Sequence, residues 1–166
     1  MVGEPLDAGH AAFLTSMWED PAVAAWLGGV KTPSQIAARL ATLERSWSER
    51  DHGVWVFRER GSGEPIGYAG LAATDVGGAG GTEVLYGVAS TAWGRGFGTE
   101  MAVAVVAHAF DELGLDELVC FTMTTNVGSQ RVMANAGFVY ESDIMHAGLP
   151  HRLSRQSRSS RPDRPH

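Results

Sequence analysis

The sequence is poor in cysteine and lysine and has no long apolar run. Its 166 residues include a single cysteine, Cys120, so a small scaffold held by disulfides is excluded. The longest strongly apolar run, Met101 to Phe110, is about half of the roughly 20 residues that a membrane-spanning helix needs, and we expect no contact with a membrane. The first residues, Met-Val-Gly-Glu-Pro, lack the basic start and apolar stretch of a secretory signal. These absences predict a cytoplasmic protein.

Basic residues are scarce outside the C-terminal end of the chain. Lysine occurs once, at Lys31, so the chain lacks the Gly-Lys pair that a phosphate-binding P-loop needs. The formal net charge is −6, although the last sixteen residues hold five of the 13 basic side chains. The rest of the chain is acidic, which argues against nucleic acid as a partner and favours cationic ligands. The five basic residues are Arg152, Arg155, Arg158, Arg161 and Arg164.

Two amphipathic helices are predicted in the first third of the chain. Asp7 can cap the first helix, which has a break at Asp20-Pro21 and ends at Gly28-Gly29. Thr32, followed by Pro33 and by Gln35, is typical of the start of a second helix. We expect the residues at helical spacing, and the tryptophans above all, to be buried: Phe13, Leu14, Met17, Trp18, Val23, Trp26, Ile36, Leu40, Leu43 and Trp47, together with Trp55 further along.

From Val54 onward, β-branched and aromatic residues separated by glycine predict strands. Two strands, Val54–Arg58 and Ile66–Leu71, form a hairpin, and a flexible turn at 77–81 precedes a third strand, Glu83–Val88. The elements expected next are a helix at Thr99–Leu113, a strand at Leu118–Thr122, a helix at Val127–Ala136, a strand at Phe138–Asp143 and a brief closing strand from His151. Met1–Leu6 leaves room for a short first strand.

This order of elements predicts an α+β fold with a mixed sheet. We expect one domain over residues 1–153. Residues 154–166 contain mainly Arg, Ser and Pro with almost no apolar side chain, and we expect this tail to be disordered.

A glycine-rich turn, Trp93 to Glu100, lies between a predicted strand and a predicted helix. Glycines at 94, 96 and 98 let the backbone approach a ligand closely, and the first amides of the helix have no partner in the helix itself. Such amides, with the positive end of the helix dipole, suit a phosphate, although a turn of this kind can also be only a turn. Thr99 stands where a dinucleotide-binding fingerprint needs glycine, so hydride transfer is not expected.

Two motifs in this order resemble a known family. The segments Gly94-Arg-Gly-Phe-Gly-Thr-Glu100, Thr125-Asn-Val-Gly-Ser-Gln-Arg-Val-Met133 and Ala136-Gly-Phe138 are similar to those of the GNAT superfamily of acetyl-CoA-dependent N-acetyltransferases. Within it, the chain resembles the branch that includes the ribosomal-protein alanine acetyltransferases. The resemblance extends from about Asp20 to Arg152, and it differs at Trp93, where the family usually has Gln or Arg.

The resemblance implies a mixed, mostly antiparallel sheet of about six strands with about four flanking helices. Its two central strands, here Glu83–Val88 and Leu118–Thr122, would splay apart. The pyrophosphate of coenzyme A would lie on the amides of Arg95, Gly96, Phe97, Gly98 and Thr99. The side chain of Arg95 could pair with a phosphate or be solvated.

The resemblance also implies catalytic roles. Glu83 matches an acidic position that many members use as a base, and the alternative is a solvated residue at a strand end. Asp143 and His146 are further candidates for the base. Ser129 would donate a hydrogen bond to the departing thiolate.

Other residues of the two motifs are expected to bind the coenzyme or to shape the fold. Asn126 is a good helix cap and would also contact the pantetheine arm. A backbone N–H near Val88 would polarise the thioester carbonyl. We expect Cys120 to be a core residue and not a nucleophile.

These observations favour an enzyme that transfers an acetyl group from acetyl-CoA to a primary amine of a small molecule or a protein N-terminus, by direct attack and without a metal. We expect a monomer or a homodimer. The alternatives are a non-catalytic domain that binds acyl-CoA or another protein, and a nucleotide-binding protein that uses the same turn.

Overall fold

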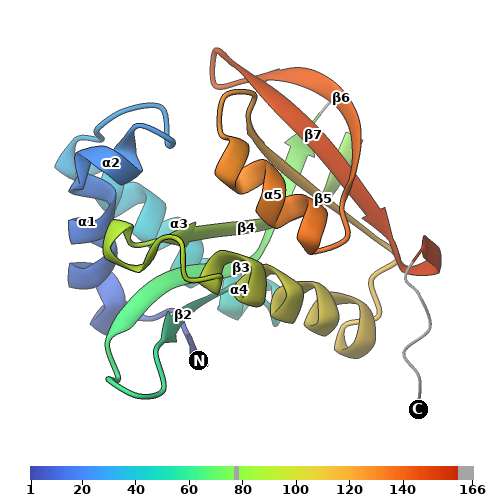
Figure 1. The fold of residues 1–166 in the computed structure, drawn as a ribbon. Coiled ribbons are helices and arrows are strands. Elements are labelled where there is room, and N and C mark those ends of the chain that lie inside the picture. The colour runs from blue at the N-terminus through green and yellow to red at the C-terminus, as the bar shows by residue number, and fades with distance from the viewer. Residues whose placement is uncertain (77–78, 161–166) are drawn as a thin grey trace.

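A single sheet of seven strands forms the centre of the computed structural model, which describes residues 1–76 and 79–160 (Figure 1). The strand order is β1-β2-β3-β4-β5-β7-β6, and all neighbours are antiparallel except β4 and β5. The strands are β1 (Val2–Pro5), β2 (Val54–Arg58), β3 (Pro65–Val76), β4 (Ala79–Val88), β5 (Glu117–Met123), β6 (Val139–His146) and β7 (Leu149–Ser157). The mostly antiparallel α+β architecture is confirmed, with seven strands in place of about six.

Five α-helices lie among the described residues, against about four predicted. They are α1 (Ala11–Glu19), α2 (Pro21–Ala24), α3 (Pro33–Arg50), α4 (Phe97–Ala107) and α5 (Val127–Asn135). The helix predicted at Thr99–Leu113 begins earlier and changes after Ala107 into a π-helical turn, His108–Glu112. Short 3₁₀ turns occur at Ala8–His10, Ser90–Ala92 and Arg158–Ser160.

The two capping residues predicted in the first third of the chain, Thr32 and Asp7, both accept backbone hydrogen bonds at the start of a helical segment. Thr32 Oγ1 accepts the Gln35 N–H at 3.3 Å, and the Gln35 side chain accepts the Thr32 N–H at 2.9 Å, which together cap α3. Asp7 caps the 3₁₀ turn ahead of α1, where its side chain accepts the Gly9 N–H at 2.8 Å. Thr32 therefore caps α3 directly, whereas Asp7 caps the 3₁₀ turn and α1 follows from Ala11 without a side-chain cap of its own.

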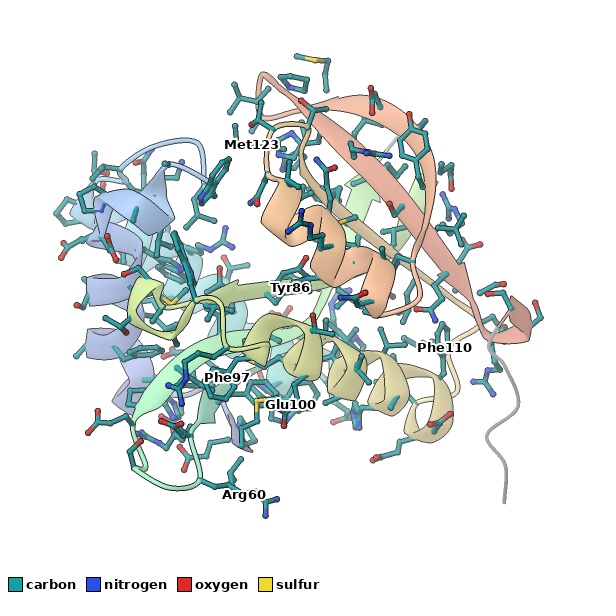
Figure 2. The ribbon with its side chains drawn as sticks, in the orientation of Figure 1. Arg60, Tyr86, Phe97, Glu100, Phe110 and Met123 are labelled. Carbon is teal, nitrogen blue, oxygen red and sulfur yellow. The ribbon has the colours of Figure 1, made fainter. Side chains whose placement is uncertain are left out.

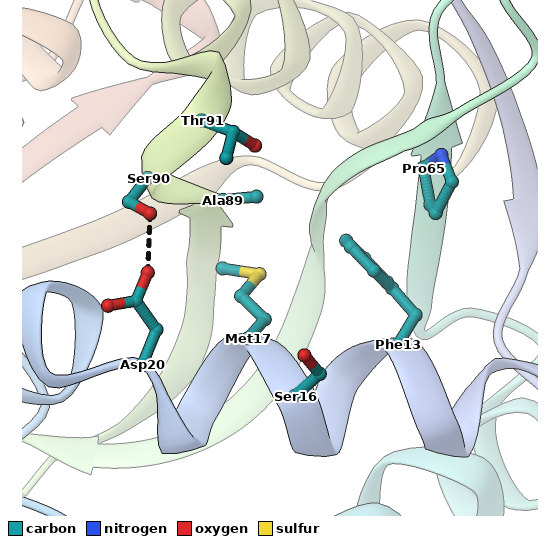
Figure 3. Close-up of a pocket in the computed structure, with 8 residues that line it drawn as sticks. All are labelled: Phe13, Ser16, Met17, Asp20, Pro65, Ala89, Ser90 and Thr91. Carbon is teal, nitrogen blue, oxygen red and sulfur yellow. Dashed lines mark hydrogen bonds between the residues drawn. The ribbon is translucent and has the colours of Figure 1, made fainter.

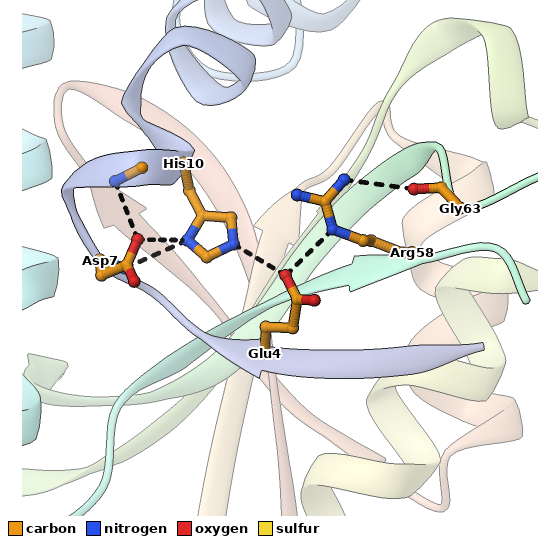
Figure 4. A network of polar contacts seen from close by, with 6 residues as sticks. Glu4, Asp7, His10, Arg58 and Gly63 are labelled. Atoms are coloured by element: carbon orange, nitrogen blue, oxygen red, sulfur yellow. Dashed lines mark hydrogen bonds and ion pairs between the residues drawn. The ribbon is translucent and has the colours of Figure 1, made fainter.

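A polar network anchors the first strand (Figure 4). Glu4 of β1 accepts a hydrogen bond from Arg58 Nε of β2 at 3.0 Å, and the same carboxylate oxygen lies 3.1 Å from His10 Nε2. His10 in turn lies 3.0 Å from the Asp7 carboxylate. Arg58 and His10 lower the pKa of Glu4, in that order of effect. The short first strand thus forms within Met1–Leu6 and is tied to its neighbour by charged side chains.

Helices cover both faces of the sheet and create two cores (Figure 1). We call the two faces the α1–α3 side and the α4–α5 side. The core on the α1–α3 side includes Leu14, Met17, Trp18, Ile36, Leu43, Val54, Val56 and Tyr68. The core on the α4–α5 side includes Phe57, Leu71, Val84, Met101, Val105, Leu118, Cys120 and Met133, so Cys120 is a core residue as expected.

The end of the sheet corrects the predicted start of a disordered tail at Ser154. β7 continues to Ser157, and Ser154 and Gln156 are buried where they pair with Cys120 and Leu118 of β5. Arg155 forms ion pairs with Glu117 and Glu141. Residues 154–157 have no apolar side chain, and backbone pairing with β5 together with the ion pairs of Arg155 keeps them in the strand. Residues 161–166 lie outside the described part of the chain.

Two smaller expectations also change. Trp26 is 40% exposed because the chain leaves the helix after Ala24, whereas Trp18 is buried as predicted. Trp47 and Trp55 are half-buried and pack edge to face, with ring centroids 4.8 Å apart. Of the turn predicted at 77–81, residues 79–81 belong to β4, and residues 77–78 lie outside the described residues.

Candidate active site

The central parallel strands β4 and β5 meet at one point and then diverge. Among the described residues, Glu83 and Val119 form the one register pair between them, whereas β5 pairs with β7 along its whole length. The expected splay is therefore present: beyond this pair the segments 84–88 and 120–123 form no register pair with each other, and we call the separation between them the gap. Glu83 lies where the gap begins.

Strand alternation gives the two sides of this gap different side chains. Val84, Tyr86 and Val88 pack into the core on the α4–α5 side, whereas Leu85 packs on the α1–α3 side. Glu83, two residues before Leu85, shares the α1–α3 side. Tyr86 and Glu83 therefore lie on opposite sides of the sheet, both in the part of β4 that borders the gap.

Glu83 is half-buried, and its surroundings change its acidity. Burial raises the pKa of Glu83 to about 7, and the positive charge of Arg39 on α3 opposes this shift. Arg39 lies over the indole ring of Trp18, with its guanidinium carbon 5.2 Å from the ring centroid. A carboxylate with a pKa near neutrality can accept a proton at physiological pH and release it again.

The two other candidate bases lie on opposite sides of the sheet. His146 packs against Phe121, with ring centroids 4.6 Å apart, and against His151 at 5.2 Å. Because Phe121 follows Val119 by two residues in β5, these rings lie on the same side as Glu83. Partial burial and then His151 lower the pKa of His146.

Asp143 does not join that group. It pairs in register with Arg152, whose guanidinium donates to Gln130 of α5 at 3.1 Å, which places Asp143 on the α4–α5 side. There it accepts a hydrogen bond from the Tyr140 hydroxyl at 3.3 Å. Of the two further candidates, His146 shares the side of Glu83 and Asp143 does not.

The glycine-rich turn leads directly into α4. Gly96 occupies the N-cap position with φ of 81°, a left-handed conformation that favours glycine, and it offers no side chain to cap the helix. A Cβ at Gly94 or Gly96 would meet nothing within 4 Å, so the surface in front of the turn is open. A Cβ at Gly98 would lie 3.3 Å from Val132 and 3.4 Å from Val88, so Gly98 instead allows α4 to pack closely. Open space and uncapped amides are what an anion needs at a helix start.

Arg95 is engaged with the β2–β3 hairpin. Its guanidinium pairs with Glu59 and lies over the ring of Phe97, 4.7 Å from the centroid. The hydrogen bond from Arg95 is the main cause that lowers the pKa of Glu59. The side chain stays half exposed to solvent, and its contact with Glu59 links the turn to a residue 36 positions away in the sequence.

Trp93 and Val88 are linked at the end of β4. The indole N–H of Trp93 donates to the Val88 carbonyl at 2.8 Å. The next amide, Ala89 N–H, donates to Ile66 of the β3 side at 2.9 Å. Because successive amides of a strand point to opposite edges, the Val88 N–H points toward the gap.

A contact that the sequence analysis missed joins β4 to α5. The Tyr86 hydroxyl lies 2.7 Å from the Ser129 hydroxyl and 3.0 Å from the Ser129 carbonyl oxygen. The Ser129 N–H donates to Asn126 Oδ1 at 3.0 Å, so the expected helix cap is present. Because Tyr86 belongs to the same predicted strand as Glu83, the sequence could have placed it beside the gap. Its contact with Ser129, 43 residues later in the chain, could not be predicted from the sequence.

A small cavity of about 220 Å³ lies between α1 and the turn after β4 (Figure 3). Asp20 caps α2 by accepting the Ala22 N–H at 2.9 Å, and it also accepts a hydrogen bond from the Ser90 hydroxyl. These two bonds lower the pKa of Asp20, with the Ser90 bond the larger cause. Asp20 thereby connects the helices on one side of the gap to the segment that precedes the glycine-rich turn.

Two kinds of feature are absent from residues 1–76 and 79–160. No three His, Cys, Asp or Glu side chains there are grouped so that they could hold a metal ion. No helix in the same residues has the length and apolarity to cross a membrane.

Comparisons with known proteins match this chain to acetyltransferases. Residues 4–139 match a family model described as "Acetyltransferase (GNAT) domain". The chain is 42% identical over 59 residues to the FsC-acetyl coenzyme A-N(2)-transacetylase of Aspergillus fumigatus, a match that covers 36% of this chain and 25% of that protein. The chain thus spans about a quarter of that relative.

Solved structures share the fold over nearly the whole chain. A putative GnaT-family acetyltransferase from Bordetella pertussis is 25% identical, with a TM-score of 0.80 over 93% of this chain and 94% of that one. The aminoglycoside acetyltransferase AAC(6')-Ib in complex with coenzyme A is 18% identical, with a TM-score of 0.77 over 95% of each chain.

Proposed function

Because this chain belongs to the GNAT acetyltransferase family, we propose that it transfers an acetyl group from acetyl-CoA to the primary amine of a small molecule or of a protein N-terminus. The observation that carries the proposal is the uncapped start of α4 at Gly96, placed beside a gap that begins at an acidic residue of shifted pKa, Glu83. Acetyl-CoA, when bound, supplies the acetyl group as a thioester.

The residues present fit this coenzyme. The backbone amides from Arg95 to Thr99 would bind the pyrophosphate, since the surface before Gly94 and Gly96 is open and the helix dipole is positive there. Asn126 would contact the pantetheine arm in addition to capping α5. The Val88 N–H, which points into the gap, would stabilise negative charge on the carbonyl oxygen.

Glu83 would act as the general base on the α1–α3 side. An amine with a pKa of about 10.4 needs roughly 4.6 kcal/mol to lose its proton at pH 7, against about 1 kcal/mol for an α-amine. A carboxylate whose pKa is about 7 can accept this proton, directly or through water. Ser129 would donate a hydrogen bond to the departing sulfur from the α4–α5 side.

Several finer statements belong to this proposal. The resemblance of the segments between Gly94 and Phe138 supports the branch that includes the ribosomal-protein alanine acetyltransferases, and with it a protein N-terminus as acceptor. The solved structure of an aminoglycoside acetyltransferase with this fold supports a small-molecule amine instead. The cytoplasm as location and a monomer or homodimer as assembly stay predictions.

The test is release of free coenzyme A from acetyl-CoA in the presence of a panel of amines, with N-terminal peptides, amino acids, polyamines and aminoglycosides as acceptors. Calorimetry with coenzyme A measures binding separately. Turnover with at least one acceptor supports the proposal. Binding without turnover on the full panel supports the non-catalytic alternative, and no heat at millimolar coenzyme overturns both.

A further inference from the structure

Tyr86 bridges the two halves of the sheet on the α4–α5 side. It projects from β4 toward α5 (Figure 2). Its hydroxyl reaches the first turn of α5, where it lies 2.7 Å from Ser129 Oγ and 3.0 Å from the Ser129 carbonyl oxygen. Asn126 holds the Ser129 amide from the other end of the same turn. Ser129 is therefore fixed at its amide, its carbonyl and its hydroxyl.

The number of hydrogens permits two arrangements of this contact. A phenol has one hydrogen, and two acceptors of Ser129 lie within its reach. In the first arrangement Tyr86 donates to the carbonyl, and Ser129 donates its own hydrogen to Tyr86. In the second, Tyr86 donates to the Ser129 hydroxyl oxygen, and the Ser129 hydrogen is free to point into the gap.

Exchange between the two arrangements needs only that the two hydroxyl hydrogens rotate about their C–O bonds. The Ser129 carbonyl lies within α5, where a helical carbonyl also accepts the N–H four residues later, so it does not depend on Tyr86. Burial, with a smaller effect of Cys120, raises the pKa of Tyr86, so the phenol keeps its hydrogen at neutral pH.

We infer that Tyr86 is a positioning residue that holds the Ser129 hydroxyl with its hydrogen directed to the departing sulfur. This inference rests on the proposed function. Tyr86 donates to the oxygen of Ser129 and so strengthens Ser129 as a donor, because hydrogen bonds in a chain polarise one another. No covalent bond to either residue forms or breaks.

The test is a double-mutant cycle of Tyr86→Phe and Ser129→Ala, with kcat and the KM for acetyl-CoA measured for each. Tyr86→Phe keeps the ring and removes one oxygen, and its melting temperature checks the fold. We expect kcat to fall by roughly tenfold, the low end for assistance by a donor, with KM for acetyl-CoA changed less than about twofold. In the Ser129→Ala background, Tyr86→Phe should cause no further fall, because the hydroxyl that it positions is absent.

Two controls sharpen the result. Tyr140→Phe makes the same chemical change at an exposed tyrosine of β6 whose hydroxyl also donates to a side chain, and it should leave kcat unchanged. In a Ser129→Thr background, which keeps a hydroxyl, the effect of Tyr86→Phe should return.

The outcomes separate this inference from the proposed function. An active wild type with an unchanged Tyr86→Phe variant overturns the inference alone. An equal fall of kcat in the wild-type and Ser129→Ala backgrounds also overturns it, because Tyr86 then acts independently of the hydroxyl. A wild type that binds coenzyme A but acetylates no amine overturns the proposed function and the inference with it.

Discussion

Glu83 lies directly opposite Val119 in the register pair that joins β4 to β5. The pair places a carboxylate where the strands begin to separate, on the side of the sheet that α3 covers with Arg39. The acidity of this group should therefore be visible in the pH dependence of turnover.

Replacement of Glu83 by Gln should lower kcat/KM and remove a titration. Because burial raises the pKa of Glu83 to about 7, the wild-type rate should rise as the pH increases through about 7 and level off above it, when the base is ionised. Glu83→Gln should reduce kcat/KM at pH 8 by about 10- to 100-fold and abolish this rise. Glu64→Gln, an exposed glutamate of the β2–β3 hairpin, is the control. A pH profile that Glu83→Gln leaves intact would exclude Glu83 as the base.

Removal of the Arg39 charge should shift the same titration. The positive charge lowers the pKa of Glu83, so Arg39→Ala should raise it and move the acidic limb of the profile to higher pH. Arg45→Ala removes an exposed arginine of the same helix, which pairs with Glu49 at 3.9 Å, and should not move the limb. Rate profiles from about pH 5.5 to about 9 would measure this. A shift to lower pH, or an equal shift in both variants, would contradict the expected coupling.

Gly96→Ala should weaken the binding of coenzyme A. At φ of 81°, an alanine is disfavoured by about 1–2 kcal/mol, so the turn should relax and turn its amides away from the phosphate position. A loss of this size corresponds to roughly a tenfold higher Kd in calorimetry. Gly61→Ala, at a glycine of ordinary φ whose Cβ would meet nothing within 4 Å, should leave the Kd unchanged. If Gly96→Ala lowers the melting temperature and leaves the Kd at the wild-type value, the turn is not the binding site.

A chain that ends at Leu153 should lose cooperative unfolding. Four register pairs to β5 are removed, from Cys120 with Ser154 to Glu117 with Ser157, and the buried Leu118 and Cys120 lose their cover at a new sheet edge. Thermal unfolding followed by circular dichroism, together with size-exclusion chromatography, would show a broad transition or aggregation. A chain that ends at Ser160 and keeps all of β7 is the reference. Equal unfolding curves would mean that this half of β7 does not stabilise the fold.

Local signals in the sequence were sufficient for most elements. Capping at Thr32 and Gln35 predicted the start of α3, and β-branched and aromatic residues separated by glycine predicted the central strands. The glycine-rich turn could be placed at the start of a helix because the apolar run from Met101 begins only five residues after Gly96.

The contacts that could not be predicted from the sequence join residues that are far apart in the chain. The link between Tyr86 and Ser129 and the pair of Arg95 with Glu59 join residues whose contact depends on the tertiary fold. The strand expected to end at Asp143 continues to His146, and strand alternation then places these two side chains on opposite sides of the sheet. The polar composition of residues 154–157 hid the end of β7.

The meeting of β4 and β5 at one rung also bears on how this framework can change over evolutionary time. Because so few backbone bonds span the joint, the angle between the half-sheets can adjust without disruption of the pairing within either half. Substitutions in outlying turns could thus widen or narrow the opening by small steps. The width of the opening could in this way change while the glycine-rich turn at the start of α4 stays as it is.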